Sequence, residues 1–299
     1  MALGLNRWQR ESIAGKIIKL MATFPLFLTV FMLFELVFRS RRLILSRPLA
    51  EILFSTAWAP LRGNFGLWPF IMGTIWVTAI AIFLAAPLSL LVAIYLSEYA
   101  PVKWREAAKP IIDLLAGLPS VIYGVWGVLV IVPFVGRVVA PALKSASNGY
   151  SVLAGGIVLA IMIFPTIVHV IVEVFRAIPA GMREASLSLG ATKWETVKYV
   201  LLRQGAPGIL AAHVLGVSRA LGETMAVLMV VGNVAKVPRS FFSGGYPLPA
   251  LIANNYGEMM SIPLYDSALM LAAAILFCLV LGFNVMARLI LVRMETRLG

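Results

Sequence analysis

Six long apolar runs divide the sequence, and each exceeds the ~20 residues that a helix needs to cross a hydrocarbon core about 30 Å thick. They cover Ile17–Phe38, Trp68–Ser97, Ile111–Phe134, Ser151–Phe175, Gly208–Gly232 and Asp266–Leu291. Only helices and closed barrels satisfy their own backbone polar groups in lipid, and these runs lack the alternation of barrel strands. The sequence therefore predicts an all-α membrane protein with six transmembrane helices. The first run is too long for the core of a signal peptide, so we expect it to be retained.

The composition supports this class and argues against several others. Charged residues make up 13% of the chain, about half of the ~25% found in soluble domains. The net charge of +12 comes from basic residues scattered through the loops, which argues against nucleic acid as a partner. The single cysteine, Cys278, excludes an intrachain disulfide. No cluster has metal-ligand spacing, and without a Walker-type loop the chain is not expected to hydrolyse ATP itself.

The basic residues also predict an orientation, with both termini in the cytoplasm. The predicted cytoplasmic set is Arg7, Arg10, Lys16, Lys103, Arg105, Lys109, Arg176, Arg183, Lys193, Lys198, Arg203, Arg288, Arg293 and Arg297. A second cluster after the first run contradicts the rule, at Arg39, Arg41, Arg42, Arg47 and Arg62. Either the remaining helices set the topology, or this cluster attracts anions or an acidic partner.

We expect two parts along the chain. Residues 1–67 form an N-terminal segment with the first helix and an outer loop, and residues 68–299 form the transmembrane core. Turn-forming residues between Asn233 and Tyr265 predict a structured cap over the outer mouth.

The fifth run contains a charge pair. Arg219 lies near its middle, where an arginine costs at least ~2.5–3.5 kcal/mol, and Glu223 follows at i+4 on the same helix face. The pair could simply neutralise itself, but two leucines would avoid the cost altogether. Since an arginine fork matches a tetrahedral oxyanion in shape and sign, we favour a role in which Arg219 attracts a crossing anion. Glu223 would then orient Arg219 and permit release.

Other polar residues in the apolar runs have two interpretations each. Ser120 and Tyr123 follow Pro119, and either donate hydrogen bonds to a passing anion or satisfy freed backbone and pack. Asp113 is expected to complement a helix N-terminus after Pro110. His169 and Glu173, at i,i+4, suit an interfacial pair better than a proton relay.

Four segments resemble one known family, the phosphate-specific ABC importer permeases. They are Arg219–Val227, Leu114–Gly124, Glu184–Thr192 and the run from Phe70 to Ser97. Together the resemblance covers roughly residues 65–235. Of the two permeases in such importers, the chain resembles the PstC type, because Met225-Ala226-Val227 follows Glu223-Thr224 where the PstA type has Ala-Pro.

The resemblance implies a type I ABC importer permease architecture in the bacterial inner membrane. The stretch after Arg183 resembles the Glu-Ala-Ala loop that an ATPase grips, which implies ATPase coupling through Glu184, Ala185, Ser186, Gly190, Ala191 and Thr192. Gly190 would supply a turn that side chains would obstruct, and Glu184–Tyr199 would move as one rigid helical lever.

The resemblance also implies partners: a second, PstA-like permease, two ATPase subunits and a soluble phosphate-binding protein. No cofactor is expected on this chain, since ATP and Mg would be bound by the partner subunits. The implied phosphate pathway, which works by alternating access, includes Arg219, Glu223, Thr224, Ser120 and Tyr123.

Three alternatives stay open. The chain could be an ABC permease for another oxyanion such as molybdate or sulfate. It could be a secondary transporter driven by an ion gradient, although no inverted repeat is recognisable. A non-transporting scaffold would leave the Arg219 and Glu223 charges unexplained.

Overall fold

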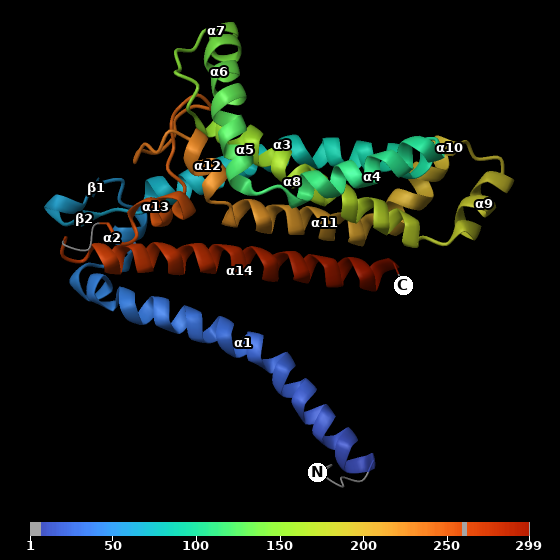
Figure 1. Cartoon of the computed structure of the whole chain (residues 1–299), viewed down its shortest axis with the longest axis horizontal. Coiled ribbons are helices and arrows are strands. Elements are labelled where there is room, and N and C mark those ends of the chain that lie inside the picture. Colours follow the sequence, from blue (N-terminus) through green and yellow to red (C-terminus); the bar gives the residue numbers. More distant parts are fainter. Residues whose placement is uncertain (1–6, 259–261, 299) are drawn as a thin grey trace, which may run out of the picture.

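The computed structural model describes residues 7–258 and 262–298, which form helices and one small hairpin (Figure 1). Six helical stretches are long and apolar enough to cross a membrane, which confirms the predicted number. They are Ile13–Ser46, Trp68–Tyr99, Ser120–Ala142, Val152–Ala177, Lys193–Gly222 and Tyr265–Met294.

Three helices form the centre of the bundle: α3 (Trp68–Ile94), α8 (Val152–Ala177) and α11 (Leu202–Gly222). Glycines permit their close approach, since a Cβ at Gly216 of α11 would lie 2.6 Å from the Ile167 side chain of α8. The small-residue stripe at Ala212, Gly216 and Ala220 is buried at this contact. Pro87 and Pro165 lie inside α3 and α8 without ending either helix.

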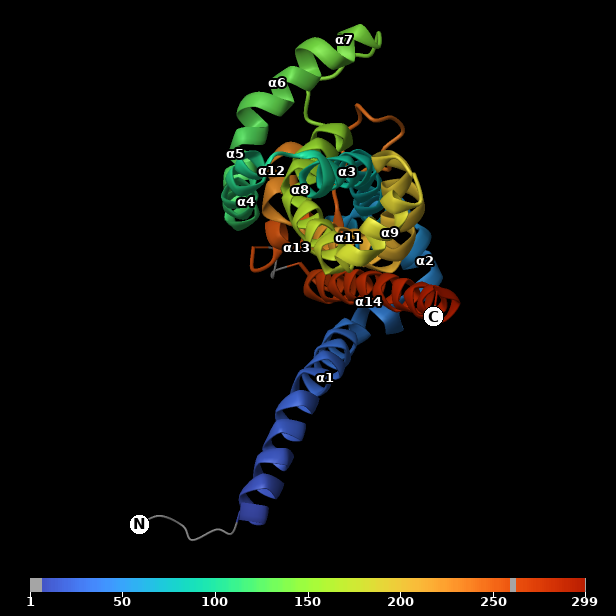
Figure 2. The same ribbon diagram turned by 90° about the vertical axis from the view of Figure 1, so that its right-hand side faces the viewer.

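Two longer helices lie on one side of this centre. Helix α14 (Tyr265–Leu298) runs alongside α11, and α1 (Arg7–Ser46) contacts α14 before diverging from the bundle (Figures 1 and 2). The hydroxyl of Ser267 donates to the Arg39 carbonyl, which ties the start of α14 to the end of α1. The apolar residues along most of α1 are exposed, as Leu20 and Phe27 illustrate.

The third predicted run is not one helix. Helix α4 (Val102–Gly117) ends before Pro119, and α5 (Ser120–Trp126) begins after it. A residue before proline is driven towards extended backbone, and Leu118 has ψ 135° accordingly. The membrane-length stretch therefore starts at Ser120 instead of Ile111. It continues through π-type turns at Gly127–Ile131 and Val135–Val139, with α6 (Val132–Phe134) and α7 (Ala140–Ala142) between and after them.

The polar segment between the fourth and fifth spans is also divided. Helix α9 (Ala180–Ser188) is followed by a turn, the short helix α10 (Lys193–Glu195) and a π-type turn at Thr196–Leu201 that leads into α11. The expected single lever over Glu184–Tyr199 is wrong, because Gly190 adopts a left-handed φ of 85° between the two helices.

A second apolar core lies at the far end of the bundle from α9 (Figure 1). Helix α2 (Leu49–Phe54), the strands β1 (Trp58–Ala59) and β2 (Asn64–Phe65), and helix α13 (Leu248–Asn255) surround it. The hairpin turns through the 3-10 segment Pro60–Arg62, with Trp58 paired to Phe65. This core joins residues on both sides of position 67, and the division of the chain there stays a prediction.

Candidate functional site

The helix breaks in the last part of the fifth predicted run, and the two charged residues lie beside this break. Helix α11 ends at Gly222, and the short helix α12 (Met225–Val230) begins after two non-helical residues. Glu223 is extended, with φ −71° and ψ 128°. In a membrane, interrupted backbone of this kind occurs where protein or a cavity surrounds it.

The two charges therefore do not share a helix face, and the predicted i+4 pair is wrong. Arg219 lies in the last turn of α11, where its Nη1 donates to the Thr166 hydroxyl of α8 at 2.7 Å. The Glu223 carboxylate instead accepts from the backbone N–H of Ala226 at 3.2 Å. Each charge complements the helix end beside it, the cation at a C-terminus and the carboxylate at an N-terminus.

The other predicted pathway residues surround this break with different partners. The Thr224 hydroxyl donates to the Gly222 carbonyl at 3.3 Å. Tyr123 is buried and donates to the Leu115 carbonyl at 2.7 Å, which braces the α4–α5 break, while its hydroxyl lies within electrostatic range of Arg219. The Ser120 hydroxyl makes no hydrogen bond to another described residue. Their roles on a pathway stay predictions.

Neighbouring polar groups tie α11 to other helices. The Ser218 hydroxyl donates to Asn284 of α14 at 2.8 Å. His213 contacts the Ile209 carbonyl at 2.7 Å and the Ala86 carbonyl of α3 at 3.4 Å, as a histidine that serves helix packing would. Arg219 differs from these residues because its side chain makes one hydrogen bond to the described residues, which leaves most of its five N–H donors for another acceptor.

A second candidate site lies at the α9 end, where Arg183 joins three segments. Its guanidinium donates to the Glu98 carboxylate at 3.1 Å, to the Phe175 carbonyl at 2.6 Å and to the Ile178 carbonyl at 2.8 Å. The side chains of Arg183 and Glu98 are only 22% and 12% exposed. Glu98 lies in the π-type turn Tyr95–Tyr99 that continues α3. The start of α9 is thereby fixed to this turn and to the end of α8.

Sequence reasoning missed this connection. Arg183 is placed by the sequence in the cytoplasmic set and before the coupling stretch, with no partner assigned to it, and Glu98 is assigned no role. A partial signal was present, since Arg183 closely follows the end of an apolar run, where helix carbonyls need donors, and Glu98 directly follows another run.

The turn after α9 is a Schellman motif. The N–H of Gly190 donates to the Leu187 carbonyl at 3.0 Å, and the N–H of Ala191 donates to the Ser186 carbonyl at 3.3 Å. Thr192 and Glu195 then form a capping box that starts α10. Nothing lies within 4 Å of a Cβ added at Gly190, so backbone strain, and not the predicted obstruction, is what requires glycine there.

The predicted coupling residues face different ways. Glu184, Ala185, Gly190 and Thr192 are exposed, whereas the Ser186 hydroxyl bonds Thr196 at 2.9 Å on the bundle side. Large apolar side chains are exposed on the same segment, with Leu189 at 90% and Trp194 at 52%. An exposed apolar rim around small residues suits contact with another protein.

Two further expectations require correction. Asp113 lies well inside α4, not at a helix N-terminus, and its carboxylate is 3.3 Å from His169 Nδ1 on α8. Glu173 pairs with Arg176 at 2.9 Å instead of with His169. Within residues 7–258 and 262–298, no group of three or more His, Cys, Asp or Glu side chains could hold a metal.

Comparison with known proteins shows the family of the chain. Residues 85–298 match a family described as "Binding-protein-dependent transport system inner membrane component". A phosphate transport system permease protein PstC of Xylella fastidiosa is 37% identical over 260 residues, covering 82% of this chain and 80% of the relative. A probable phosphate transport system permease protein PstC of Methanocaldococcus jannaschii is 33% identical, covering 90% of each. A probable ABC transporter permease protein, YqgH of Bacillus subtilis, is 38% identical over 78% of this chain and 76% of its own length.

Solved structures share the fold. An inward-facing structure of the MetNI methionine ABC transporter matches with a TM-score of 0.58 at 21% identity, covering 76% of this chain and 97% of that chain. A bacterial ABC transporter involved in alginate import matches with a TM-score of 0.55 at 16% identity, covering 95% and 99%.

Proposed function

We propose, from the premise that the chain belongs to the family of binding-protein-dependent transport system inner membrane components, that it is the PstC-type permease subunit of a phosphate importer. Its fold is that of type I ABC importer permeases, as the sequence predicted. It is a transport component of the membrane, and ATP hydrolysis with its Mg belongs to partner subunits. A second, PstA-like permease would complete the pathway.

The observation that supports an oxyanion as the substrate is the position of Arg219 beside a helix break. A guanidinium in a membrane helix with one hydrogen bond, to Thr166, has donors left for a tetrahedral oxyanion. The curated relatives named for phosphate transport favour phosphate over molybdate or sulfate. Glu223 would not pair with Arg219. Its hydrogen bond to the Ala226 N–H would instead hold the start of α12 beside the anion's route.

Transport would proceed by alternating access driven from the α9 segment. ATPase closure would push the exposed face of α9 and α10, and the Arg183–Glu98 connection would carry that movement into α3 and α8. The soluble phosphate-binding protein would dock at the opposite end, where α13 and the hairpin lie (Figure 1).

This mechanism requires α9 to face the cytoplasm of a bacterial inner membrane. The end of α14 lies at the same end of the bundle as α9 (Figure 1), which supports cytoplasmic termini. The side chains of Arg7, Arg10 and Arg297, which entered the charge argument, lie outside the described residues. Residues 259–261 of the predicted outer cap do as well.

Uptake by the reconstituted complex tests the function. Proteoliposomes that carry this chain, the sister permease, the ATPases and the binding protein should accumulate radiolabelled phosphate only with ATP on the ATPase side. Collapse of the proton gradient should leave uptake intact. Uptake that needs the gradient and ignores ATP would establish the secondary-transporter alternative, and preference for molybdate or sulfate would reassign the substrate.

Gly190 provides a prediction for the coupling segment. Gly190→Val should weaken association with the ATPase or its coupling to transport, because a branched residue at φ 85° costs about 1–2 kcal/mol. Gly190→Asn is the matched control, since asparagine tolerates this conformation. Co-purification of the ATPase and phosphate uptake per ATP measure the effect, and membrane insertion should be unchanged. Normal coupling in the valine variant would contradict the assignment of this segment.

A further inference from the structure

Two adjoining cavities lie at the end of the molecule that carries α13. One, of about 560 Å³, is lined by Ser147, Asn148, Tyr150 and Asn233 together with Leu228 and Met229 of α12. The other, of about 540 Å³, is lined by Thr56, Lys236, Arg239 and Ser243. Val234 and Gly244 line both cavities, so the two adjoin. No acidic residue occurs among the described residues that line them.

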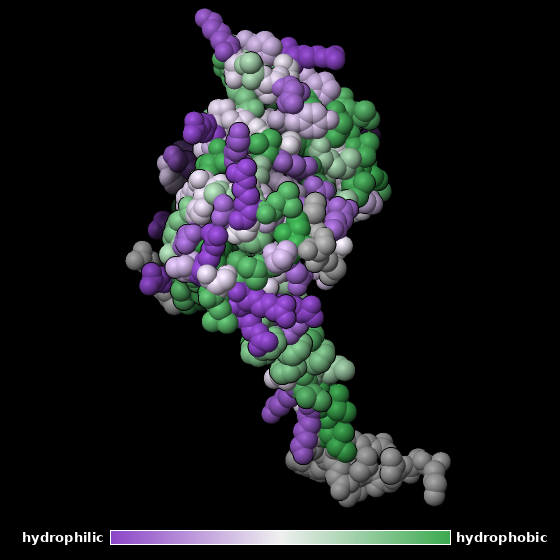
Figure 3. All heavy atoms as spheres, turned by 90° about the vertical axis from the view of Figure 1, so that its left-hand side faces the viewer, coloured by the Kyte–Doolittle hydropathy of each residue, from purple (hydrophilic) through white to green (hydrophobic). Residues whose placement is uncertain are grey.

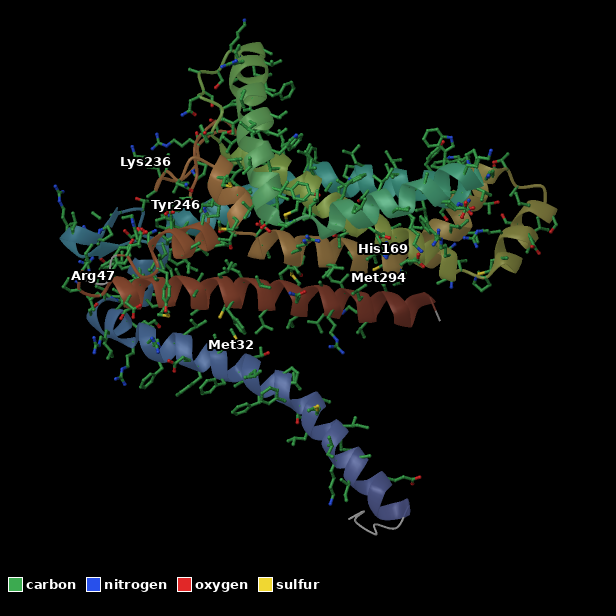
Figure 4. The ribbon with its side chains drawn as sticks, viewed as in Figure 1. Met32, Arg47, His169, Lys236, Tyr246 and Met294 are labelled. Carbon is green, nitrogen blue, oxygen red and sulfur yellow. The ribbon has the colours of Figure 1, made fainter. Side chains whose placement is uncertain are left out.

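The two cations of the second cavity are not neutralised within the described chain. Neither Lys236 nor Arg239 forms an ion pair there, whereas Arg39, Arg47, Arg176 and Arg183 are each paired with a glutamate. Lys236 extends from the loop between α12 and α13, away from α14 (Figure 4). Figure 3, which faces this end of the molecule, shows hydrophilic side chains spread over its surface.

The loop that carries these cations is held in place by its backbone. Val234 N–H donates to the Gly245 carbonyl at 3.1 Å, and Val152 and Leu153 at the start of α8 donate to the carbonyls of Ser243 and Phe241 at 3.0 Å each. Phe241 also packs edge-on against Trp76, with ring centroids 5.4 Å apart. The charges are therefore presented from an ordered surface, which reduces the entropy lost on binding.

We propose that Lys236 and Arg239 form an outer staging site for a tetrahedral oxyanion, which is phosphate if the proposed function holds. Asn233 lines the adjoining cavity beside Ser147 and Asn148, so that cavity has polar walls. The buried Oδ1 of Asn233 has no hydrogen-bond partner among the described residues. That cavity borders α12, whose six residues span about 9 Å and lead to the break beside Arg219. Phosphate released outside would be concentrated here before it reaches Arg219.

The site is open to solvent, since Lys236 and Arg239 are both exposed. The expected enrichment of the anion is accordingly modest, about tenfold at low salt, and it should fall as ionic strength rises.

A cysteine reporter tests the local preference for anions. Thr56 lines the cavity and is exposed, so Thr56→Cys in a Cys278→Ser background, in the assembled complex, places one thiol of this chain there. The measured quantity is the ratio of two modification rates at this thiol, that of a membrane-impermeant anionic thiosulfonate divided by that of a cationic analogue. This ratio should be about tenfold higher than in the same chain with K236Q/R239Q. The matched control is Lys144→Gln, which removes an exposed charge outside both cavities and should leave the ratio unchanged. An equal ratio in all variants would overturn the proposal.

Competition and transport assays distinguish substrate staging from lipid binding and from protein docking. Millimolar phosphate should slow the anionic reagent in neutral-lipid proteoliposomes. Slowing by anionic lipid, with no effect of added phosphate, would assign the site to headgroups and overturn a substrate role.

In uptake assays, K236Q/R239Q should lower the maximal rate without changing the KM for phosphate-loaded binding protein. A raised KM with an unchanged maximal rate would make this a docking surface for that protein instead. The thiol assay needs no transport, so the two proposals can fail separately. The staging proposal fails if the ratio is equal in all variants, even where Arg219→Gln lowers uptake. The proposed function fails if Arg219→Gln leaves uptake unaltered, even where the ratio differs.

Discussion

Phosphate uptake should fall by about 10- to 100-fold when Arg219 is replaced with Gln, although the complex still assembles. A hydrogen bond from a charged group contributes ~1.5–3 kcal/mol, and each 1.4 kcal/mol corresponds to a tenfold change. Glutamine keeps a donor for Thr166, so the packing of α11 against α8 should survive. The initial rate of radiolabelled phosphate uptake, with subunit content measured in the same vesicles, provides the test.

Two further variants make this result specific. Arg219→Lys should also transport poorly, because lysine presents a point charge and not a planar fork. Ser218→Ala is the matched control, since it removes the adjacent hydrogen bond to Asn284, a contact worth only ~0.6 kcal/mol in membranes. Uptake should stay near normal in that variant. An Arg219→Gln complex with unaltered uptake would remove the anion role altogether.

Arg183→Gln should uncouple ATP hydrolysis from transport and lower the stability of the chain by about 2–3 kcal/mol. Loss of the guanidinium removes the cationic partner of Glu98, and one donor each from the carbonyls of Phe175 and Ile178, in a largely buried position. Removing one partner of a fully buried pair costs ~3–5 kcal/mol, and partial exposure reduces that figure here. The thermal midpoint of the purified complex and the phosphate imported per ATP hydrolysed measure the two effects.

A double-mutant cycle with Glu98→Gln would isolate the side-chain pair, for which coupling of ~0.5–3 kcal/mol is expected. Arg176→Gln is the control, because that arginine forms an exposed pair with Glu173 on the same end of α8. If Arg183→Gln and Arg176→Gln behave alike, the Arg183 network does not transmit movement from α9.

The number of membrane spans followed from apolar length alone, because a hydrocarbon core imposes the same length on every helix. Their internal breaks did not follow as easily. Pro87, Pro165 and Pro119 all lie in predicted apolar runs, yet of these three only Pro119 stands at a helix end. Gly117 contributes to the difference, because glycine weakens a helix and adds to the loss of a backbone donor at the proline.

The candidate site was predictable in its residues and not in its geometry. Arg219 stood out because a charge in an apolar run is costly, but the i+4 pairing with Glu223 assumed a continuous helix. Tertiary contacts decided otherwise, since Thr166 on α8 and the N–H of Ala226 satisfy the two side chains separately. The Arg183–Glu98 contact joins residues 85 positions apart, and no local pattern in one sequence specifies such a partner.

The length of α1 bears on how the protein meets the edge of the bilayer. The apolar stretch Ile17–Phe38 rises about 33 Å, which already fills the lipid interior. The last two turns of α1, with Arg39, Arg41 and Arg42, therefore extend among the headgroups. Leu43 in these turns packs into the second apolar core, so this core lies where water can reach it. Urea should loosen this cluster first, while the helices surrounded by lipid stay folded.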